Sequence, residues 1–237
     1  INEKDSMRTL LFTAAVFIVV CTTSIVTAEK DCDKDGNCKM TANDMWEFFG
    51  CEEIFEKPRP VHNQSTWALM RGVYTGVVKH KSTIEPLSLE SGLLVPFEVR
   101  QSEKGRGLYA TAPVKKDTLV WTPKKQSACF STGDHYRAFL YHIPVDCACD
   151  VLQWAYVKSF GPDKKKDAMI CADLDEGSFM NGDYEGGESA NLACVGGDES
   201  CKQTLDLTAI RDIEVGEELI CKYGDFAISK GWKWFGL

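Results

Sequence analysis

The stretch that most constrains this chain is a loop and strand pair near its C-terminal end. The loop, from Ala172 to Leu192, is acidic and rich in glycine, and it carries two asparagines, Asn181 and Asn191. Two apolar segments follow, separated by the turn-like sequence Glu214-Val-Gly216. Apolar runs on either side of a glycine-containing turn predict two short strands. The second strand is predicted to end at Tyr223, because Gly224 follows it directly.

The region upstream of this loop combines strands with a helical segment. Short apolar runs separated by polar turns predict a β-rich core; they are Leu93–Val99, Gly107–Ala112 and Thr118–Trp121. Between residues 127 and 160 the apolar residues fall at helical spacing. We therefore expect two helices there, divided by Ile143-Pro144 and by Cys147-Ala-Cys149.

Composition limits the partners of this chain. It has 237 residues, of which 44% are hydrophobic and 26% charged, enough for one sizeable core with an appendage. The net charge of −8 argues against direct binding to nucleic acid, which needs a surplus of Lys and Arg. An acidic protein suits a basic protein partner better. The sequence does not specify an oligomeric state.

The first 28 residues have the three parts of a secretory signal peptide. Met7-Arg8 supplies the basic start, Leu10–Val20 the apolar centre, and Val26-Thr-Ala28 a small-residue cleavage site. We predict cleavage after residue 28, with Met7 as the start. The alternative is that residues 9–28 remain as an uncleaved anchor, which is the one case in which the sequence predicts a membrane contact. A protein with a cleaved signal peptide is expected in the endoplasmic reticulum lumen or secreted.

The cysteines point to the same compartment. The chain has 11 cysteines, and removal of Cys21 with the signal peptide leaves an even number, ten. In a secretory chain this predicts disulfides, for instance a local Cys32–Cys38 loop. Asn63-Gln-Ser65 is a glycosylation sequence. We predict no metal site, because Cys147-x-Cys149 has no second pair and the calcium-like loop from Asp31 has Ala42 where a glutamate is needed.

Residues 29–92 are expected to form an irregular N-terminal appendage. Asn43 is predicted to cap a short helix, which Lys57-Pro-Arg-Pro60 would end. Val73, Thr75 and Val77 alternate with other residues, so Trp67–Val78 is predicted to be rich in strand.

Four motifs together resemble the SET-domain family of protein lysine methyltransferases over roughly residues 94–225. They are Gly105-Arg-Gly107, Phe179-Met-Asn181, Asn191, and Gly216-Glu-Glu-Leu219 with Tyr223-Gly224. The resemblance implies a β-rich α+β, SET-domain-like β-clip fold, with small curved sheets, a helical insert and a threaded C-terminal segment. It divides the chain into the appendage (29–92), a SET-like domain (93–225) with its insert at about 127–160, and an aromatic tail (226–237).

The same resemblance implies the site residues. Tyr223 is the expected catalytic residue, whose phenol points at the methyl group being transferred from S-adenosylmethionine. The cofactor is expected to lie against Gly105, Arg106, Gly107, Asn181, Gly182 and Asn191. Cys221 stands where a bulkier aromatic is frequent, which predicts room for di- or trimethylation unless a disulfide occupies it. Trp232 and Trp234 are expected to wall the substrate channel or to cover the core.

Two departures bear on activity. Gly182 stands where the family usually has histidine, and the segment between Asn181 and Asn191 is longer than usual, with Ala190 in place of proline.

Acidic residues crowd the same region, either as a docking surface for a basic peptide or as a solvated loop: Asp173, Asp175, Glu176, Asp183, Glu185 and Glu188. We therefore expect an S-adenosylmethionine-dependent lysine methyltransferase acting on a lysine-bearing, non-histone protein. The alternative is an inactive SET-fold module that binds protein.

Overall fold

The computed structural model describes most of the chain from Met40 onwards. The described residues are 40–82, 84, 90–102, 104–123, 126–183, 189–194, 205–225 and 227–237. All of them belong to one compact unit, which spans Cys32–Leu237. The predicted signal peptide and the predicted Cys32–Cys38 loop lie outside the described residues. Among the residues that are described, none of the helices has the length and apolar character needed to cross a bilayer.

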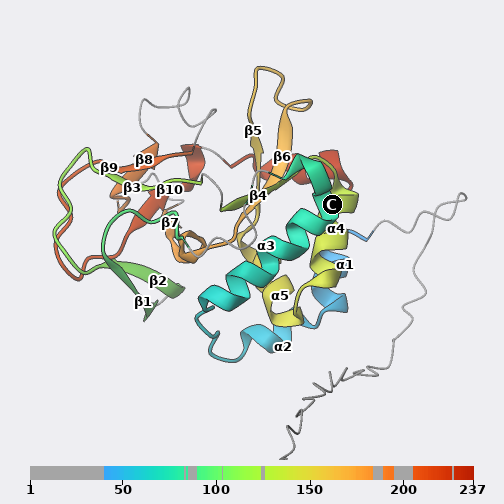
Figure 1. Ribbon diagram of the computed structural model, residues 1–237, viewed down its shortest axis with the longest axis horizontal. Helices are drawn as coiled ribbons and strands as arrows, with labels where there is room; N and C mark the ends of the chain where they lie inside the picture. Colours follow the sequence, from blue (N-terminus) through green and yellow to red (C-terminus); the bar gives the residue numbers. More distant parts are fainter. Residues whose placement is uncertain are drawn as a thin grey trace, which may run out of the picture. The chain divides into compact units, whose positions relative to one another are not determined.

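Five α-helices pack together at one side of this unit (Figure 1). They are α1 (Ala42–Phe48), α2 (Cys51–Phe55), α3 (Gln64–Val78), α4 (Gly133–His142) and α5 (Val145–Trp154). α3 packs against α4, and α5 contacts α1, α2 and α4. The disulfide Cys51–Cys149 ties α2 to α5 across 98 residues of sequence. The N-terminal appendage is therefore built into the same body as the helical insert.

The strands form three small sheets, as expected from the sequence. The first is a hairpin of β1 (Phe97–Ser102) and β2 (Gly105–Ala110). The second has the order β4-β6-β5, from Ser127–Phe130, Ala168–Asp173 and Tyr156–Ser159. The third has the order β3-β9-β8-β10-β7, with strands at Leu119–Trp121, Leu207–Ala209, Leu192–Cys194, Ile220–Lys222 and Asn181–Asp183.

The pairing of β10 brings the predicted motifs together. β10 lies between β8 and β7 and runs parallel to both. Cys221 is opposite Leu192 on one side and opposite Gly182 on the other. The segment before β10 also pairs with β2, because Leu219 N donates to Leu108 O at 2.7 Å. β10 therefore lies beside the segments that carry Asn181 and Asn191, and the residue before it bonds to the glycine-rich strand β2.

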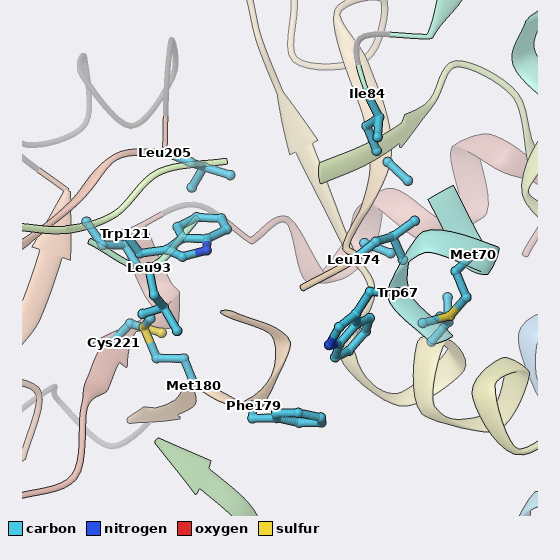
Figure 2. Close-up of a cluster of buried hydrophobic side chains, with 14 of the residues drawn as sticks. Trp67, Met70, Ile84, Leu93, Trp121, Leu174, Phe179, Met180, Leu205 and Cys221 are labelled. Carbon is cyan, nitrogen blue, oxygen red and sulfur yellow. The ribbon is translucent and has the colours of Figure 1, made fainter. Parts of the chain in front are cut away.

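A continuous apolar core joins the helices to the sheets (Figure 2). Trp67 and Met70 of α3 are fully buried, and Leu174, Phe179 and Met180 extend the cluster towards the sheets. Phe179, Trp67 and Trp154 lie with ring centroids 5.5–6.0 Å apart. Aromatic pairs at such distances add stabilisation beyond the burial of their area.

The prediction of strand at Trp67–Val78 is wrong, because this segment is the helix α3. Its buried residues are Trp67, Met70, Arg71, Tyr74 and Val78. Spacings of three and four residues place these side chains on one face of a helix. Asn63 caps the helix by accepting a hydrogen bond from Thr66 N at 3.0 Å. Two further predictions need correction: Thr41 rather than Asn43 caps α1, and β1 begins at Phe97 rather than Leu93.

The helical insert follows the prediction in part. Two helices occur, and Ile143-Pro144 separates them. Cys147 and Cys149 lie inside α5 and do not interrupt it. Cys149 is in the disulfide with Cys51, whereas Cys147 carries a buried thiol. The ends of the predicted segment are strands rather than helix, namely β4 and β5.

The C-terminal tail docks on the second sheet. It contains the 3-10 helix η4 (Ser229–Phe235), and Ile228 N donates to Val157 O of β5 at 2.8 Å. Gly231 is needed here, because a Cβ at this position would lie 2.9 Å from Cβ of Val157. This contact places the tail aromatics beside β5 and the end of β10.

Candidate active site

One pocket brings the predicted motifs together. It has a volume of about 1000 Å³. It is lined by Gly105 and Arg106, which begin strand β2 rather than lying in the predicted turn, and by Asn181 and Gly182 from β7. Tyr223 lines it where β10 ends. Segments more than 100 residues apart in sequence therefore share one concave surface.

The glycine-rich turn is built for close approach of backbone groups. Gly105 has φ of +97°, a conformation that residues with side chains rarely adopt. A Cβ on Gly107 would collide with the carboxylate of Glu218, so a side chain at 107 would displace Glu218. Asn181 Nδ2 donates to Glu218 Oε1 at 2.7 Å and to Arg106 O at 3.1 Å. Glu218, which the sequence analysis missed, therefore joins the turn to β7.

These bonds change the expected role of Asn181. An amide nitrogen has two hydrogens, and both are directed to protein acceptors here. Donation from Asn181 to the carboxylate of a cofactor is therefore not available in this arrangement. Acceptance through Oδ1 is the part of its predicted role that this geometry allows. Its contact with a cofactor remains a prediction.

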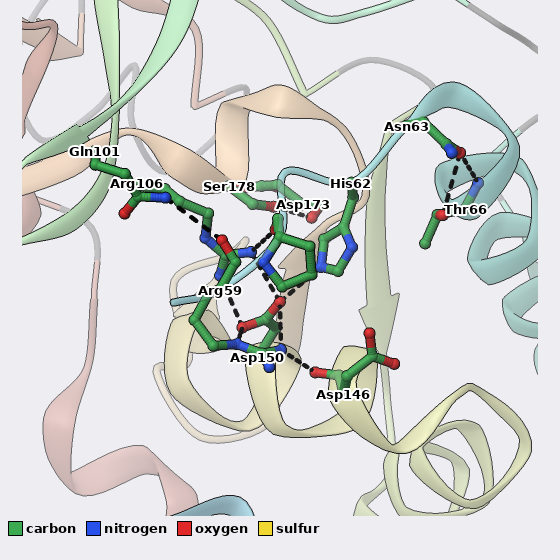
Figure 3. A network of polar contacts seen from close by, with 11 residues as sticks. Arg59, His62, Asn63, Thr66, Gln101, Arg106, Asp146, Asp150, Asp173 and Ser178 are labelled. Carbon is green, nitrogen blue, oxygen red and sulfur yellow. Dashed lines mark hydrogen bonds and ion pairs between the residues drawn. The ribbon is translucent and has the colours of Figure 1, made fainter. Parts of the chain in front are cut away.

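The side chain of Arg106 points away from the turn into a buried polar network (Figure 3). Its guanidinium holds both carboxylate oxygens of Asp150, at 2.7 and 3.0 Å. His62 Nε2 and Arg59 Nε also bond to this carboxylate, at 2.6 and 3.1 Å. Burial opposes ionisation of Asp150, but these bonds from His62, Arg106 and Arg59 outweigh it and lower the pKa to about 2. The cofactor turn is thereby anchored to α5 and to the N-terminal segment.

Gly182 and Tyr223 are in close contact. A Cβ at position 182 would lie 2.5 Å from Cγ and Cε2 of the Tyr223 ring, a separation that real atoms do not reach. The Tyr223 hydroxyl donates to Met180 O at 2.8 Å, which fixes the orientation of the phenol. Glycine in place of the usual histidine therefore has a local explanation. It makes room for the ring of Tyr223.

Asn191 is placed as a support for the site. Its side chain is 1% exposed and does not line the pocket. Its Nδ2 donates to Glu218 O at 2.7 Å, and its Oδ1 accepts from Ile220 N at 2.9 Å. These bonds fix the backbone where β10 begins. Its predicted contact with a cofactor would need a rearrangement of these bonds.

Part of the pocket lining is apolar. Cys221 lines the pocket as a buried thiol, and it is not part of a disulfide. Trp232 lines the pocket too, and its role as a wall of the substrate channel remains a prediction. Trp234 does not line the pocket but packs against the core. Tyr156 of β5 and Asp173 of β6 also line the pocket; the sequence analysis named Asp173 only as a member of the acidic region and did not select Tyr156.

The prediction of a solvated acidic loop is wrong for two of its members. Asp175 is fully buried and accepts hydrogen bonds from Gly92 N at 2.5 Å and Gly177 N at 3.0 Å. Burial raises the pKa of Asp175 to about 6. Glu176 is 8% exposed and bonds to Gln64 of α3. Glu185 and Glu188 lie outside the described residues.

Comparisons with known proteins agree with the motifs. The model of the SET domain matches residues 105–224, about half of the chain. A curated relative, N-lysine methyltransferase KMT5A-A of Danio rerio, is 29% identical over 148 residues. That alignment covers 62% of this chain and 39% of the relative, so the chain spans well under half of the relative's length.

Two solved structures are also similar. ATXR5 in complex with histone H3.1 mono-methylated on R26 is 17% identical, with a TM-score of 0.36, over 59% of this chain and 62% of that one. The Neurospora SET domain protein DIM-5, a histone lysine methyltransferase, is 19% identical with the same TM-score, over 56% of this chain and 53% of that one. The extent of the family match, together with the meeting of its motifs at one pocket, shows that this chain belongs to the SET-domain family.

Proposed function

We propose that this chain is an S-adenosylmethionine-dependent protein-lysine N-methyltransferase of the secretory pathway that acts on a non-histone protein. The observation that carries the proposal is the single pocket shared by the Gly105–Gly107 turn, Asn181 and Tyr223. Family membership and the similarity to a lysine methyltransferase support it.

The residues present fit the cofactor. A volume of about 1000 Å³ suits a nucleoside-sized ligand together with a side chain. Gly105 and Arg106 would present backbone groups to it, and Asn181 and Gly182 would form the opposite wall. When bound, S-adenosylmethionine would supply the methyl group.

In this proposal Tyr223 is the catalytic residue. Its bond to Met180 O fixes the phenol where it lines the pocket. From there its oxygen and the nearby carbonyl can favour a positively polarised methyl through weak C–H···O contacts. Methyl transfer also needs the amine, the methyl and the leaving sulfur in line, which a rigid wall promotes. The apolar lining favours the neutral, reactive form of a lysine amine.

The disulfides support the secretory part of the proposal. Cys51–Cys149 and Cys129–Cys171 are both bonded, and Cys194 is also in a disulfide. Structural disulfides persist mainly in oxidising compartments. This agrees with the predicted signal peptide and is the reason to propose a non-histone substrate. Asn63 remains a predicted glycosylation site.

A second candidate is a non-catalytic module that keeps the fold and binds a protein partner. The use of both Asn181 amide hydrogens within the protein favours it, as does glycine at position 182. This candidate predicts that the pocket does not bind S-adenosylmethionine.

Transfer of a labelled methyl group tests the enzyme directly. Disulfide-intact protein would be incubated with methyl-tritiated S-adenosylmethionine and either secreted proteins or core histones, followed by amino-acid analysis. We expect labelled methyl-lysine in the secreted proteins and a loss of about 100-fold for Tyr223→Phe. Tyr141→Phe, at a tyrosine 45% exposed on α4, is the matched control. Label on histones alone would contradict the proposed substrate class, and label in neither would contradict the activity.

A further inference from the structure

A carboxyl group lines the pocket, and the role proposed for Tyr223 does not use it. Asp173 ends β6 and lines the pocket with Tyr156 of β5, Cys221 of β10 and Trp232 of the tail. Apolar side chains make up much of the surrounding wall, among them Val157, Leu205 and Ile228. Asp173 therefore faces the same pocket as the Gly105–Gly107 segment and Tyr223.

The bonds that hold Asp173 fix its direction and leave it able to accept more. Ser127 Oγ of β4 donates to Oδ1. The Tyr156 hydroxyl lies 3.3 Å from Oδ1 and 3.5 Å from Oδ2. A carboxylate can accept about four hydrogen bonds, and in the described part of the chain only these two hydroxyls approach it as donors. Ser178 Oγ donates to the backbone carbonyl of Asp173, which further fixes the residue (Figure 3).

The charges around Asp173 favour a cation. Burial raises its pKa to about 7, the hydroxyls of Ser127 and Tyr156 lower it, and the charge of Asp175 raises it. Two other titratable groups face this cluster. The Tyr156 hydroxyl bonds to Asp173, and the thiol of Cys221 acts electrostatically on Tyr156. Among the described residues, no lysine or arginine forms an ion pair with Asp173. Asp173 is half-buried, and a carboxylate withdrawn from water without a cationic partner is costly, so a charged ligand that enters the pocket gains by pairing with it.

We propose that Asp173 is the residue that recognises the ammonium group of the substrate side chain. Its carboxylate accepts hydrogen bonds from the entering ammonium, and Tyr156 and Ser127 orient it. This pairing favours the charged form of the amine and so serves recognition, whereas the apolar part of the lining favours the later loss of the proton. For lysine as the natural substrate this rests on the proposed function. The recognition itself requires only a primary ammonium on an aliphatic chain.

The test uses two small probes of equal shape without any cofactor, n-butylammonium and n-butanol. Trp121, Trp154 and Trp232 line the pocket, so tryptophan fluorescence reports their binding. At pH 8 we expect the wild-type protein to bind the ammonium at least about tenfold more tightly than the alcohol. Asp173→Asn keeps an acceptor for Ser127 and Tyr156 and should abolish the preference. Asp183→Asn removes another carboxylate that lines the same pocket and should retain it.

A second measurement needs no variant and covers the case in which Asp173→Asn does not fold. As the pH is lowered through about 7, Asp173 becomes neutral, so the wild-type affinity for n-butylammonium should fall while that for n-butanol stays constant. A wild-type protein with equal affinity for both probes, or a preference unaffected by Asp173→Asn, would overturn the inference. Binding of S-adenosylmethionine is measured separately. If S-adenosylmethionine does not bind but the preference for n-butylammonium is intact, only the proposed function is contradicted. If S-adenosylmethionine binds but the preference is absent, only the role of Asp173 is contradicted.

Discussion

At position 182 the backbone passes so close to Tyr223 that only glycine fits. Gly182→Ala should therefore shift the phenol, weaken its bond to Met180 O and destabilise the protein by about 1–3 kcal/mol. Methyl transfer should fall more than cofactor affinity, because the ring is displaced from the reacting end. Steady-state kinetics and thermal unfolding measure the two effects.

The control for this substitution is Gly224→Ala. Gly224 is the next residue after Tyr223, and a Cβ there meets no atom within 4 Å. It should change stability and transfer little. Equal effects at both positions would show that the contact between residue 182 and the phenol is not what limits substitution.

The buried carboxylate of Asp150 gives the protein an acid-sensitive contribution to stability. Its folded pKa of about 2 lies below the usual value near 3.8, so the stabilisation is complete above about pH 4 and is lost as the pH falls towards 2. Asp150→Asn should cost about 3–5 kcal/mol at pH 7, because Arg106 and Arg59 lose their partner. It should also flatten the decline in unfolding free energy between pH 4 and 2.

Urea unfolding at a series of pH values measures both consequences. Asp212→Asn is the comparison, because Asp212 also pairs with a cation, Lys115, but its side chain is 53% exposed. It should cost much less than Asp150→Asn, because solvent screens an exposed ion pair. An Asp150 variant as stable as the Asp212 variant would contradict the anchoring of the cofactor turn by this network.

At the scale of elements, the motifs could be predicted from the sequence, but many of the residues that hold them in place could not. The sequence was sufficient for the strand that leads into Tyr223 and for the helix pair, because each is encoded within a few residues, whereas Gly105–Gly107 begins strand β2 instead of the predicted turn. α3 was assigned to strand because Val73, Thr75 and Val77 alternate with other residues, whereas the helical spacing of its buried residues becomes evident only once the core is known. Asp150 and Glu218 escaped prediction because their partners lie 37 to 91 residues away.

The Cys51–Cys149 disulfide between α2 and α5 should stabilise the folded protein, although Cys51 lies outside the residues that match the SET domain. It closes a separation of 98 residues, and α2 leads into the segment that carries Arg59 and His62. Replacing Cys51 and Cys149 together by alanine should lower the unfolding free energy by about 2–4 kcal/mol. Cys147→Ala is the control, because Cys147 lies in the same helix as Cys149 but is not in a disulfide. Equal unfolding temperatures for the two variants would contradict this role.

At the scale of the whole molecule, the account predicts a defined cysteine pattern in protein from the secretory pathway. Mass spectrometry without reduction should find Cys51 joined to Cys149 and Cys129 joined to Cys171. Cys147 and Cys221 should be alkylated once the protein is unfolded. The mature N-terminus is predicted at residue 29. Alkylation of Cys51, Cys149, Cys129 and Cys171 in protein isolated from cells would contradict the proposed compartment.

The central claim is that the pocket shared by the Gly105–Gly107 turn, β7 and Tyr223 binds S-adenosylmethionine. Calorimetric titration into disulfide-intact protein tests it without knowledge of the substrate. We expect saturable binding at one site per chain, retained in Tyr223→Phe and weakened about tenfold in Asn181→Ala. The absence of binding at millimolar S-adenosylmethionine would contradict the account and leave the non-catalytic module as the function of this SET domain.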